Sequence, residues 1–337
     1  MAKAREIEGL DCGAEAAGGI RLVLSSRIDE TLAYRDAALV AEDPEGVHDM
    51  RVASRRLRSA LRDFAPYMSE KRVAGVRVEV KRLADALGRV RDIDVEAAAL
   101  EEAAREAPEG VRAGVEERAR ARRAGGAQAR EELAGELGED GLARLRAEFA
   151  DALTKALGAA RERRKGKGGA LRRGVSFGDV GRKVVVARWE ELEKRAASLY
   201  RPFKTRRLHK TRISAKRLRY ALELFVPCLG EELGDFAKEV ARLQKSLGEV
   251  HDCDEWIASL GVELSKREGD ADADAAKSPD AGARVGRAET AAWLFDHFVE
   301  RRNLHYREAF ARWRAWGRED FESRLRTCVG RRESGAV

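Results

Sequence analysis

The stretch VHDMRVASRRLRSALRDF, from Val47 to Phe64, recurs 161 positions later as LHKTRISAKRLRYALELF, from Leu208 to Phe225. A second block, LGRVRDIDV starting at Leu87, recurs at nearly the same shift as LGEVHDCDE. Two blocks that return in the same order at a common shift indicate an internal repeat, in which each copy is one structural unit. The sequence therefore predicts two similar halves.

The first block has the pattern of an amphipathic helix. The positions of its expected core seam are spaced alternately by three and four, as in a helix packed in a bundle. They are Val47, Met50, Ser54, Leu57, Leu61 and Phe64. The chain is 44% hydrophobic, 37% charged and only 6% aromatic, a composition that favours amphipathic helices over β-sheets. We expect an all-α fold with a core in each half.

The repeat also predicts how the chain is divided. Residues 18–160 are expected to form the first helical bundle and residues 177–328 the second, joined by a basic, glycine-rich linker at 161–176. Two local features are expected as well. Asp92 caps the start of a further helix, and the acidic stretch from Ser265 to Gly282 forms a loop.

A row of basic residues runs along each repeated helix, beside the apolar seam. At about 100° per residue, spacings of three and four keep such a row within an arc of roughly 80°. The candidate ligand-binding residues are His48, Arg51, Arg55, Arg56 and Arg58 in the first copy, His209, Arg212, Lys216, Arg217 and Arg219 in the second, and Arg82 and Arg242 on the helices that follow. The first row continues to Arg62, where the second has Glu223. Parallel rows of cations repel one another unless an anion lies between them, so a polyanionic ligand is predicted.

Phosphate suits this mixture of side chains, because arginine offers a planar fork of donors, lysine a compact charge and histidine an N–H donor. The formal net charge of the chain is +7, and residues 201–220 contain nine Lys or Arg and no acid. Duplex DNA is less favoured, because no helix presents Asn or Gln base readers, and single strands usually stack on aromatic side chains. Nucleic acid remains the alternative polyanion by charge.

The motifs HDMRVASRRLR with LGRVRDIDV, and HKTRISAKRLR with LGEVHDCDE, resemble those of the CHAD family, the conserved histidine α-helical domain. The resemblance covers both halves and implies two four-helix bundles related by a pseudo-twofold repeat. It further implies that the basic helices face a shared cleft or pore that binds inorganic polyphosphate, with the basic residues named above as the ligand face. Extra helical material between about Glu101 and Gly138 departs from the family pattern.

Many CHAD relatives also carry a triphosphate-processing domain with an ExExK motif, which this sequence lacks. We therefore expect a stand-alone protein that binds polyphosphate and is not an enzyme. Such a protein would be targeted to polyphosphate granules, or would regulate polyphosphate metabolism with enzymes of that metabolism as partners.

A metal-dependent phosphohydrolase is the rival interpretation. The residues that could be gathered into two metal sites are His48, Asp92 and Asp94 in one half and His209, His251, Asp252 and Asp254 in the other. The neighbouring arginines would repel a cation, so these acids are interpreted as helix caps or ion-pair partners. No metal and no cofactor are expected.

The four cysteines, Cys12, Cys228, Cys253 and Cys328, are far apart and form no CxxC pair, so neither a zinc ribbon nor a disulfide framework is expected. The N-terminus lacks an apolar signal core, and no stretch approaches the ~18 apolar residues of a membrane span. A cytoplasmic protein without a membrane partner is predicted.

Overall fold

The structure is a computed structural model that describes residues 5–40, 44–162, 174–270 and 281–331. Within these ranges the regular structure is helical, apart from an isolated bridge between Glu15 and Ser176. The helices of the first part are α1 (Ala16–Ala33), α2 (Arg35–Leu39), α3 (Pro44–Asp63), α4 (Glu70–Glu106), α5 (Glu109–Ala124), α6 (Gly126–Glu136) and α7 (Glu139–Glu162). Those of the second part are α8 (Phe177–Ala196), α9 (Thr205–Leu229), α10 (Glu232–Asp270), α11 (Ala281–Arg318) and α12 (Phe321–Gly330). The expected all-α class is confirmed.

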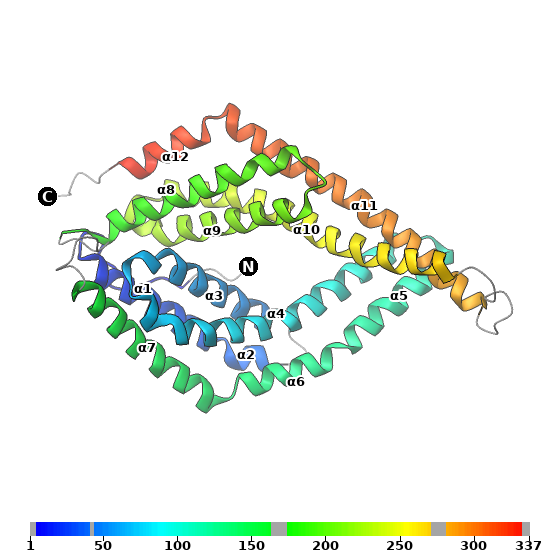
Figure 1. Ribbon diagram of the computed structural model, residues 1–337, viewed down its shortest axis with the longest axis horizontal. Coiled ribbons are helices and arrows are strands. Elements are labelled where there is room, and N and C mark those ends of the chain that lie inside the picture. Colours follow the sequence, from blue (N-terminus) through cyan, green and yellow to red (C-terminus); the bar gives the residue numbers. More distant parts are fainter. Residues whose placement is uncertain (1–4, 41–43, 163–173, 271–280, 332–337) are drawn as a thin grey trace.

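Figure 1 shows α1–α7 in the lower part of the molecule and α8–α12 in the upper part. Helix α3 packs between α1 and α4, helix α9 packs between α8 and α10, and α3 and α9 also contact each other. The two helices that carry the repeated block therefore lie where the two parts meet. Helices α4, α5, α10 and α11 extend together to one end of the molecule (Figure 1).

One hydrophobic core runs through both parts, instead of the separate cores that we expected. At its centre, the ring of Phe64, directly after α3, lies 5.9 Å from that of Phe177 in α8 and 6.3 Å from that of Phe225 in α9. A Cβ atom on Gly19 would come within 2.5 Å of the Phe177 ring, so glycine is what lets α1 approach this cluster. A smaller second core, which includes Leu100 and Leu294, forms where α4, α5, α10 and α11 meet.

Local packing explains how α3 is held. A Cβ atom on Gly46, in the first turn of α3, would lie 2.0 Å from the carbonyl oxygen of Ala37 in α2. Only glycine allows this close approach of the two backbones. At its other end α3 stops at Asp63, and a 3-10 turn from Ala65 to Tyr67 with Pro66 follows, because proline cannot continue the hydrogen-bonded helix.

Two expectations about helix boundaries are wrong. Helix α4 is continuous from Glu70 to Glu106, so Asp92 lies inside a helix and caps none. A long apolar face that stays buried on both sides of this residue keeps the helix unbroken. Helix α10 likewise continues to Asp270, so the start of the expected acidic loop is helical. Residues 271–280 of that loop lie outside the described residues, and its last two, Ala281 and Gly282, begin α11.

The expected linker at 161–176 lies mostly outside the described residues, which omit 163–173. Helix α7 continues to Glu162 before it, and α8 begins after it with a capping box. In that box the Ser176 hydroxyl accepts a hydrogen bond from the Asp179 amide at 3.1 Å. The extra material expected between Glu101 and Gly138 consists of the last turn of α4 with α5 and α6.

The cysteine prediction is also wrong, because Cys12 and Cys228 form a disulfide that spans 216 positions of the sequence. The bond joins the segment before α1 to the C-terminal end of α9. Nearby, the Gly178 amide donates to the Cys12 carbonyl at 2.9 Å, which holds the same segment against α8. No local spacing announces such a pair, because only the folded chain brings the two thiols together. Cys253 and Cys328 are buried free thiols.

Candidate functional site

A cleft lies between α3 and α4 on one side and α9 and α10 on the other. It consists of a cavity of about 460 Å³ lined by α3, α4 and α9, and one of about 610 Å³ that continues to α10 and α11. Arg51, Arg55 and Asp92 line both cavities, so the two are parts of one cleft. This is the cleft referred to below.

Cations from both repeated helices line the cleft. They are Arg51, Arg55, Arg58 and Arg62 of α3, and Arg212, Lys216 and Arg217 of α9, with His209 of α9 in the same row. Each helix buries its apolar seam against its own part, which leaves the adjacent basic row facing the opposite helix. The two rows, far apart in the sequence, therefore share one space.

The charges of the two rows act on each other. Burial, followed by the charges of Arg55 and Arg212, lowers the pKa of Lys216 to about 7. Burial and the charge of Arg55 lower the pKa of Arg51 to about 10, although Asp92 opposes this shift. Burial and the neighbouring like charges both disfavour these cations, and a bound anion would offset both effects. The cleft is thus prepared for an anion.

Two histidines line the wider cavity. The ring centroids of His209 in α9 and His251 in α10 are 4.1 Å apart. Burial, then His251 and Arg212, lower the pKa of His209 to about 4. Burial and Arg212 also lower the pKa of His251. Both imidazoles are therefore neutral at pH 7, and each offers one N–H donor to a ligand.

Acids are present on the cleft wall, but arginines face them. The Arg51 guanidinium donates to the Asp92 carboxylate at 2.9 Å. Asp252 occupies the matching position of α10, where burial raises its pKa and the charge of Arg212 opposes this shift. Asp92 orients Arg51, and Arg212 acts on Asp252 through its charge. Glu96, Glu102, Glu249 and Glu255 also line the wider cavity, so the excess of cations lies in the narrower cavity between α3 and α9.

Of the residues of the rival metal interpretation, Asp92, His209, His251 and Asp252 line the wider cavity, whereas His48, Asp94 and Asp254 do not. The Asp94 carboxylate accepts a hydrogen bond from Arg130 at 2.6 Å, and that of Asp254 accepts one from Arg302 at 2.5 Å. Neither arginine lines the cleft, so both acids are paired away from it. Among the described residues, the group with metal-binding geometry is Glu45, His48 and Asp49, at the start of α3. The two sites that the metal interpretation predicted are not assembled.

Five of the predicted ligand residues do not line the cleft. Arg56 is buried on the side of α3 that faces α1, with its guanidinium 3.5 Å from Glu30. Arg219 is buried, pairs with Glu223 at 3.4 Å and lies over the Tyr220 ring. Arg56 points about 100° away from Arg55 because it is the next residue of the helix. Arg219 corresponds to Arg58, which lines the cleft, so the burial of Arg219 beside Glu223 is particular to the second half.

The other three are Arg82, Arg242 and His48. Arg82 is exposed and forms ion pairs with Glu79 and Glu136 at 2.9 and 3.2 Å. Arg242 is exposed on α10. His48 is half-buried at the start of α3, where burial and Arg91 lower its pKa. Helix α3 therefore contributes arginines but no histidine to the cleft, in contrast to α9.

Sequence reasoning missed several cleft residues. Arg62 was part of the first row but was not chosen, because its counterpart is Glu223. His251 was considered only as a metal ligand, although the repeat aligns it with Arg91. Arg301 and Trp256 have no repeated motif around them, so no pattern of the sequence could have found them.

The comparisons with known proteins agree with this architecture. The family model of the CHAD domain matches residues 22–261, and the chain belongs to the CHAD domain family. No curated protein matches it. Among the described residues, no helix is long and apolar enough to cross a membrane.

Two solved structures have a similar fold. The CHAD domain from the plant Ricinus communis is 24% identical, with a TM-score of 0.59, and the match covers 91% of this chain and 95% of that one. PptA from Streptomyces chartreusis is 14% identical, with a TM-score of 0.62, and the match covers 89% and 100%. At these identities the likeness concerns the fold.

Proposed function

We propose that the cleft binds inorganic polyphosphate, with cations from both halves of the molecule on one chain of phosphates. The observation that carries this proposal is the convergence of Arg51, Arg55 and Arg58 with Arg212 and Lys216 in one cleft. A polyphosphate carries about one negative charge per phosphate along an unbranched chain. Such a chain can follow the row along α3 and α9 and neutralise successive side chains.

We also propose that the chain is a twofold repeat, with residues 18–160 and 177–328 as its two copies. Helices α1, α3 and α4 pack on one another in the same order as α8, α9 and α10. This common packing order supports the proposal, and a pseudo-twofold relation between the trios would turn the same basic face of each copy towards the other. A shared site between the copies then follows from the repeat itself.

Polyphosphate fits the cleft better than nucleic acid does. Base recognition by single-strand binders rests on open aromatic faces. Of the aromatic side chains on the cleft wall, Trp256 is stacked on Phe298 with centroids 5.1 Å apart, and Tyr220 is covered on one face by Arg219. Phosphate groups alone make full use of the arginines and Lys216.

Binding without turnover is the mode of action that we propose. Asp92, which lines both cavities, is held by Arg51 at 2.9 Å, and this pairing supports binding without catalysis at that carboxylate. Retention on polyphosphate granules, or delivery of an enzyme of polyphosphate metabolism to its substrate in the cytoplasm, is the role that this binding would serve.

Titration with polyphosphate of defined lengths at several salt concentrations tests the proposal. We expect affinity to fall steeply with salt, and long chains to bind more tightly than triphosphate, because only a long chain reaches the cations of both helices. Charge reversal by Arg55→Glu or Lys216→Glu should weaken binding. Arg242→Glu is the matched control, since this exposed arginine lies outside the cleft.

Three results would contradict the proposal. Equal loss of affinity in Arg242→Glu and Arg55→Glu would mean that net charge, not the cleft, attracts the ligand. Displacement of long polyphosphate by tRNA or duplex DNA at equal phosphate concentration would make nucleic acid the ligand. Phosphate release that Asp92→Ala abolishes would show an enzyme.

A further inference from the structure

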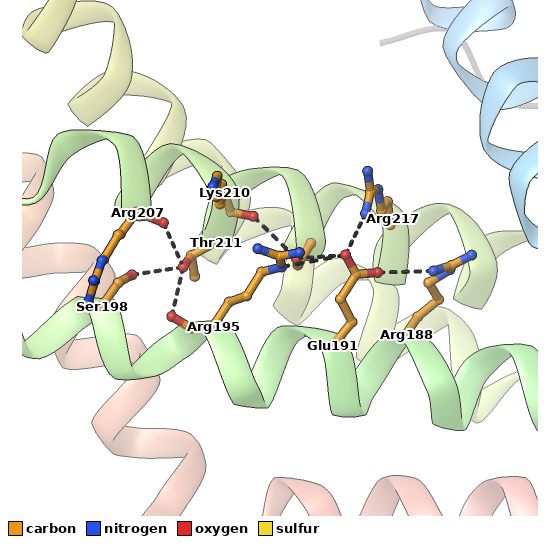
Figure 2. Close-up of polar contacts among 9 residues, drawn as sticks. Arg188, Glu191, Arg195, Ser198, Arg207, Lys210, Thr211 and Arg217 are labelled. Carbon is orange, nitrogen blue, oxygen red and sulfur yellow. Dashed lines mark hydrogen bonds and ion pairs between the residues drawn. The ribbon is translucent and has the colours of Figure 1, made fainter.

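Glu191 of α8 holds three arginines beside the cleft. Figure 2 shows its carboxylate between Arg188 and Arg195 of the same helix and Arg217 of α9. Arg188 donates to it at 2.9 Å, Arg195 lies 3.5 Å away, and Arg217 forms the shortest contact. Burial alone would raise the pKa of Glu191, but the charges of Arg217 and Arg188 hold it below its ordinary value. The carboxylate is therefore ionised at neutral pH.

The first half contains the same arrangement. Glu30 of α1 is buried and accepts from Arg27 of the same helix at 2.5 Å, and its other oxygen lies 3.5 Å from Arg56 of α3. Glu30 corresponds to Glu191 at the shift of 161 positions that relates the two basic helices. Arg27 with Arg188, and Arg56 with Arg217, correspond at the same shift.

Each held arginine has a cleft residue directly before it. Arg55 precedes Arg56, and Lys216 precedes Arg217, and both preceding residues line the cleft. Neighbouring residues of an α-helix point about 100° apart. Because a helix is stiff, fixing the direction of one residue fixes the direction of the next. An acid that holds the second cation therefore sets where the first one points.

We infer that Glu30 and Glu191 are positioning residues for the cleft: each holds the second cation of an adjacent pair, and thereby turns the first, Arg55 or Lys216, towards the ligand. This inference rests on the proposed binding function. The negative charge of each glutamate would by itself repel a bound anion and weaken binding. If the glutamates are positioning residues, each of them instead strengthens binding.

That opposition of signs provides the test. In Glu191→Gln the carboxylate charge is lost with little change of shape, and in Glu191→Asp the charge stays but is drawn back by one methylene. We expect both variants to bind long polyphosphate roughly fivefold more weakly than the wild type, the size of an ordinary coupling between neighbouring side chains. Asp85→Asn is the matched control, because it removes an exposed acid at the cleft wall that pairs with Lys81 at 2.5 Å and not with a cleft arginine of α3 or α9. It should bind at least as tightly as the wild type.

A double-mutant cycle separates positioning from loss of stability. If Glu191 acts by directing Lys216, Glu191→Gln should weaken binding much less in a Lys216→Ala background than in the wild type. A general loss of folding would add to the effect of Lys216→Ala instead. Arg217 itself lines the cleft, so Arg217→Lys is measured in the same cycle: it should weaken binding in the wild type and much less in the Lys216→Ala background, whereas a lost direct contact of Arg217 would cost the same in both.

The inference is overturned if Glu191→Gln strengthens binding as Asp85→Asn does, or if Glu191→Asp and Arg217→Lys bind like the wild type. Its failure is distinct from failure of the proposed function. If only the positioning role fails, the wild-type protein still binds polyphosphate through the cleft. If the proposed function fails, the wild-type protein does not bind polyphosphate.

Discussion

Arg55 of α3 and Lys216 of α9 line the same cavity, and burial together with the charge of this arginine lowers the pKa of the lysine to about 7. Two residues from equivalent places in the repeat thus oppose each other. The folded protein holds this unfavourable pair because the large core beneath the two helices fixes both in place. The repulsion has measurable consequences for binding and for stability.

The first consequence is that binding should take up protons. A bound polyphosphate supplies negative charge, which favours the ammonium form and raises the pKa of Lys216 above 7. Between the two pKa values the complex holds a proton that the free protein lacks, so affinity should fall as pH rises above about 7. Calorimetry at pH 8 in two buffers of different ionisation enthalpy would measure this uptake, expected at up to about one proton per site. Lys216→Met should abolish it, and uptake that persists in this variant would assign the proton to another group.

The second consequence is that Lys216 should lower the stability of the free protein. Its folded pKa lies below the unfolded value, so the unfolded chain binds the proton more readily and the stability of wild type is lower below pH 7 than above it. Lys216→Met should raise the Tm of the free protein, most clearly at pH 6, while weakening polyphosphate binding. Calorimetric scans at pH 6 and pH 9 check this, and a lower Tm for the variant at pH 6 would contradict it.

The ion pair between Asp63 of α3 and Arg188 of α8 should stabilise the junction of the two parts. The nitrogen–oxygen distance is 2.6 Å, and the Asp63 side chain is almost fully buried. Arg188→Met leaves this carboxylate without a partner and should reduce the free energy of unfolding by about 3 kcal/mol at pH 7. Urea unfolding measures the loss.

The pH dependence of this loss is a separate check. Burial raises the pKa of Asp63 to about 6, even though Arg188 opposes the shift, and without Arg188 it rises further. The folded variant therefore holds a proton that the unfolded chain lacks, and its stability should improve as pH falls from 7 to 5. Arg146→Met is the control, since its pair with Asp29 at 2.8 Å is exposed and should contribute below about 1 kcal/mol.

The disulfide between Cys12 and Cys228 should stabilise the attachment of the N-terminal segment. Its reduction, or the Cys12→Ser variant, should lower the free energy of unfolding by about 3 kcal/mol, because the closed loop covers most of the chain. Thermal unfolding with and without dithiothreitol measures the difference. Cys253→Ser is the control, since this thiol is free, and it should not change the response to the reductant. Four reactive thiols in the unreduced, denatured protein would show that the bond does not form.

The helices and the cationic rows could be predicted because their signals are local. Apolar residues at intervals of three and four placed the seam of α3, and the repeat placed that of α9. Features that depend on contacts between distant segments of the chain could not be predicted. The continuity of α4 through Asp92 depends on what packs on both sides of it, and the Cys12–Cys228 bond depends on how the N-terminal segment returns to α9.

By itself, the sequence determined that the chain is helical, belongs to the CHAD architecture and carries cations along two equivalent helices. The helices and the cationic rows follow from residue type and helical period, which are the same in any packing arrangement, and the resemblance to the CHAD family rests on the repeated motifs. Only the tertiary structure decided which cations share the cleft, because the direction of a side chain is set by the neighbouring helices. Arg55 and Arg56 are adjacent and chemically alike, yet one faces the cleft and the other is held by Glu30 in the core. The physical reason is the contact between α1 and α3, which no pattern within α3 contains.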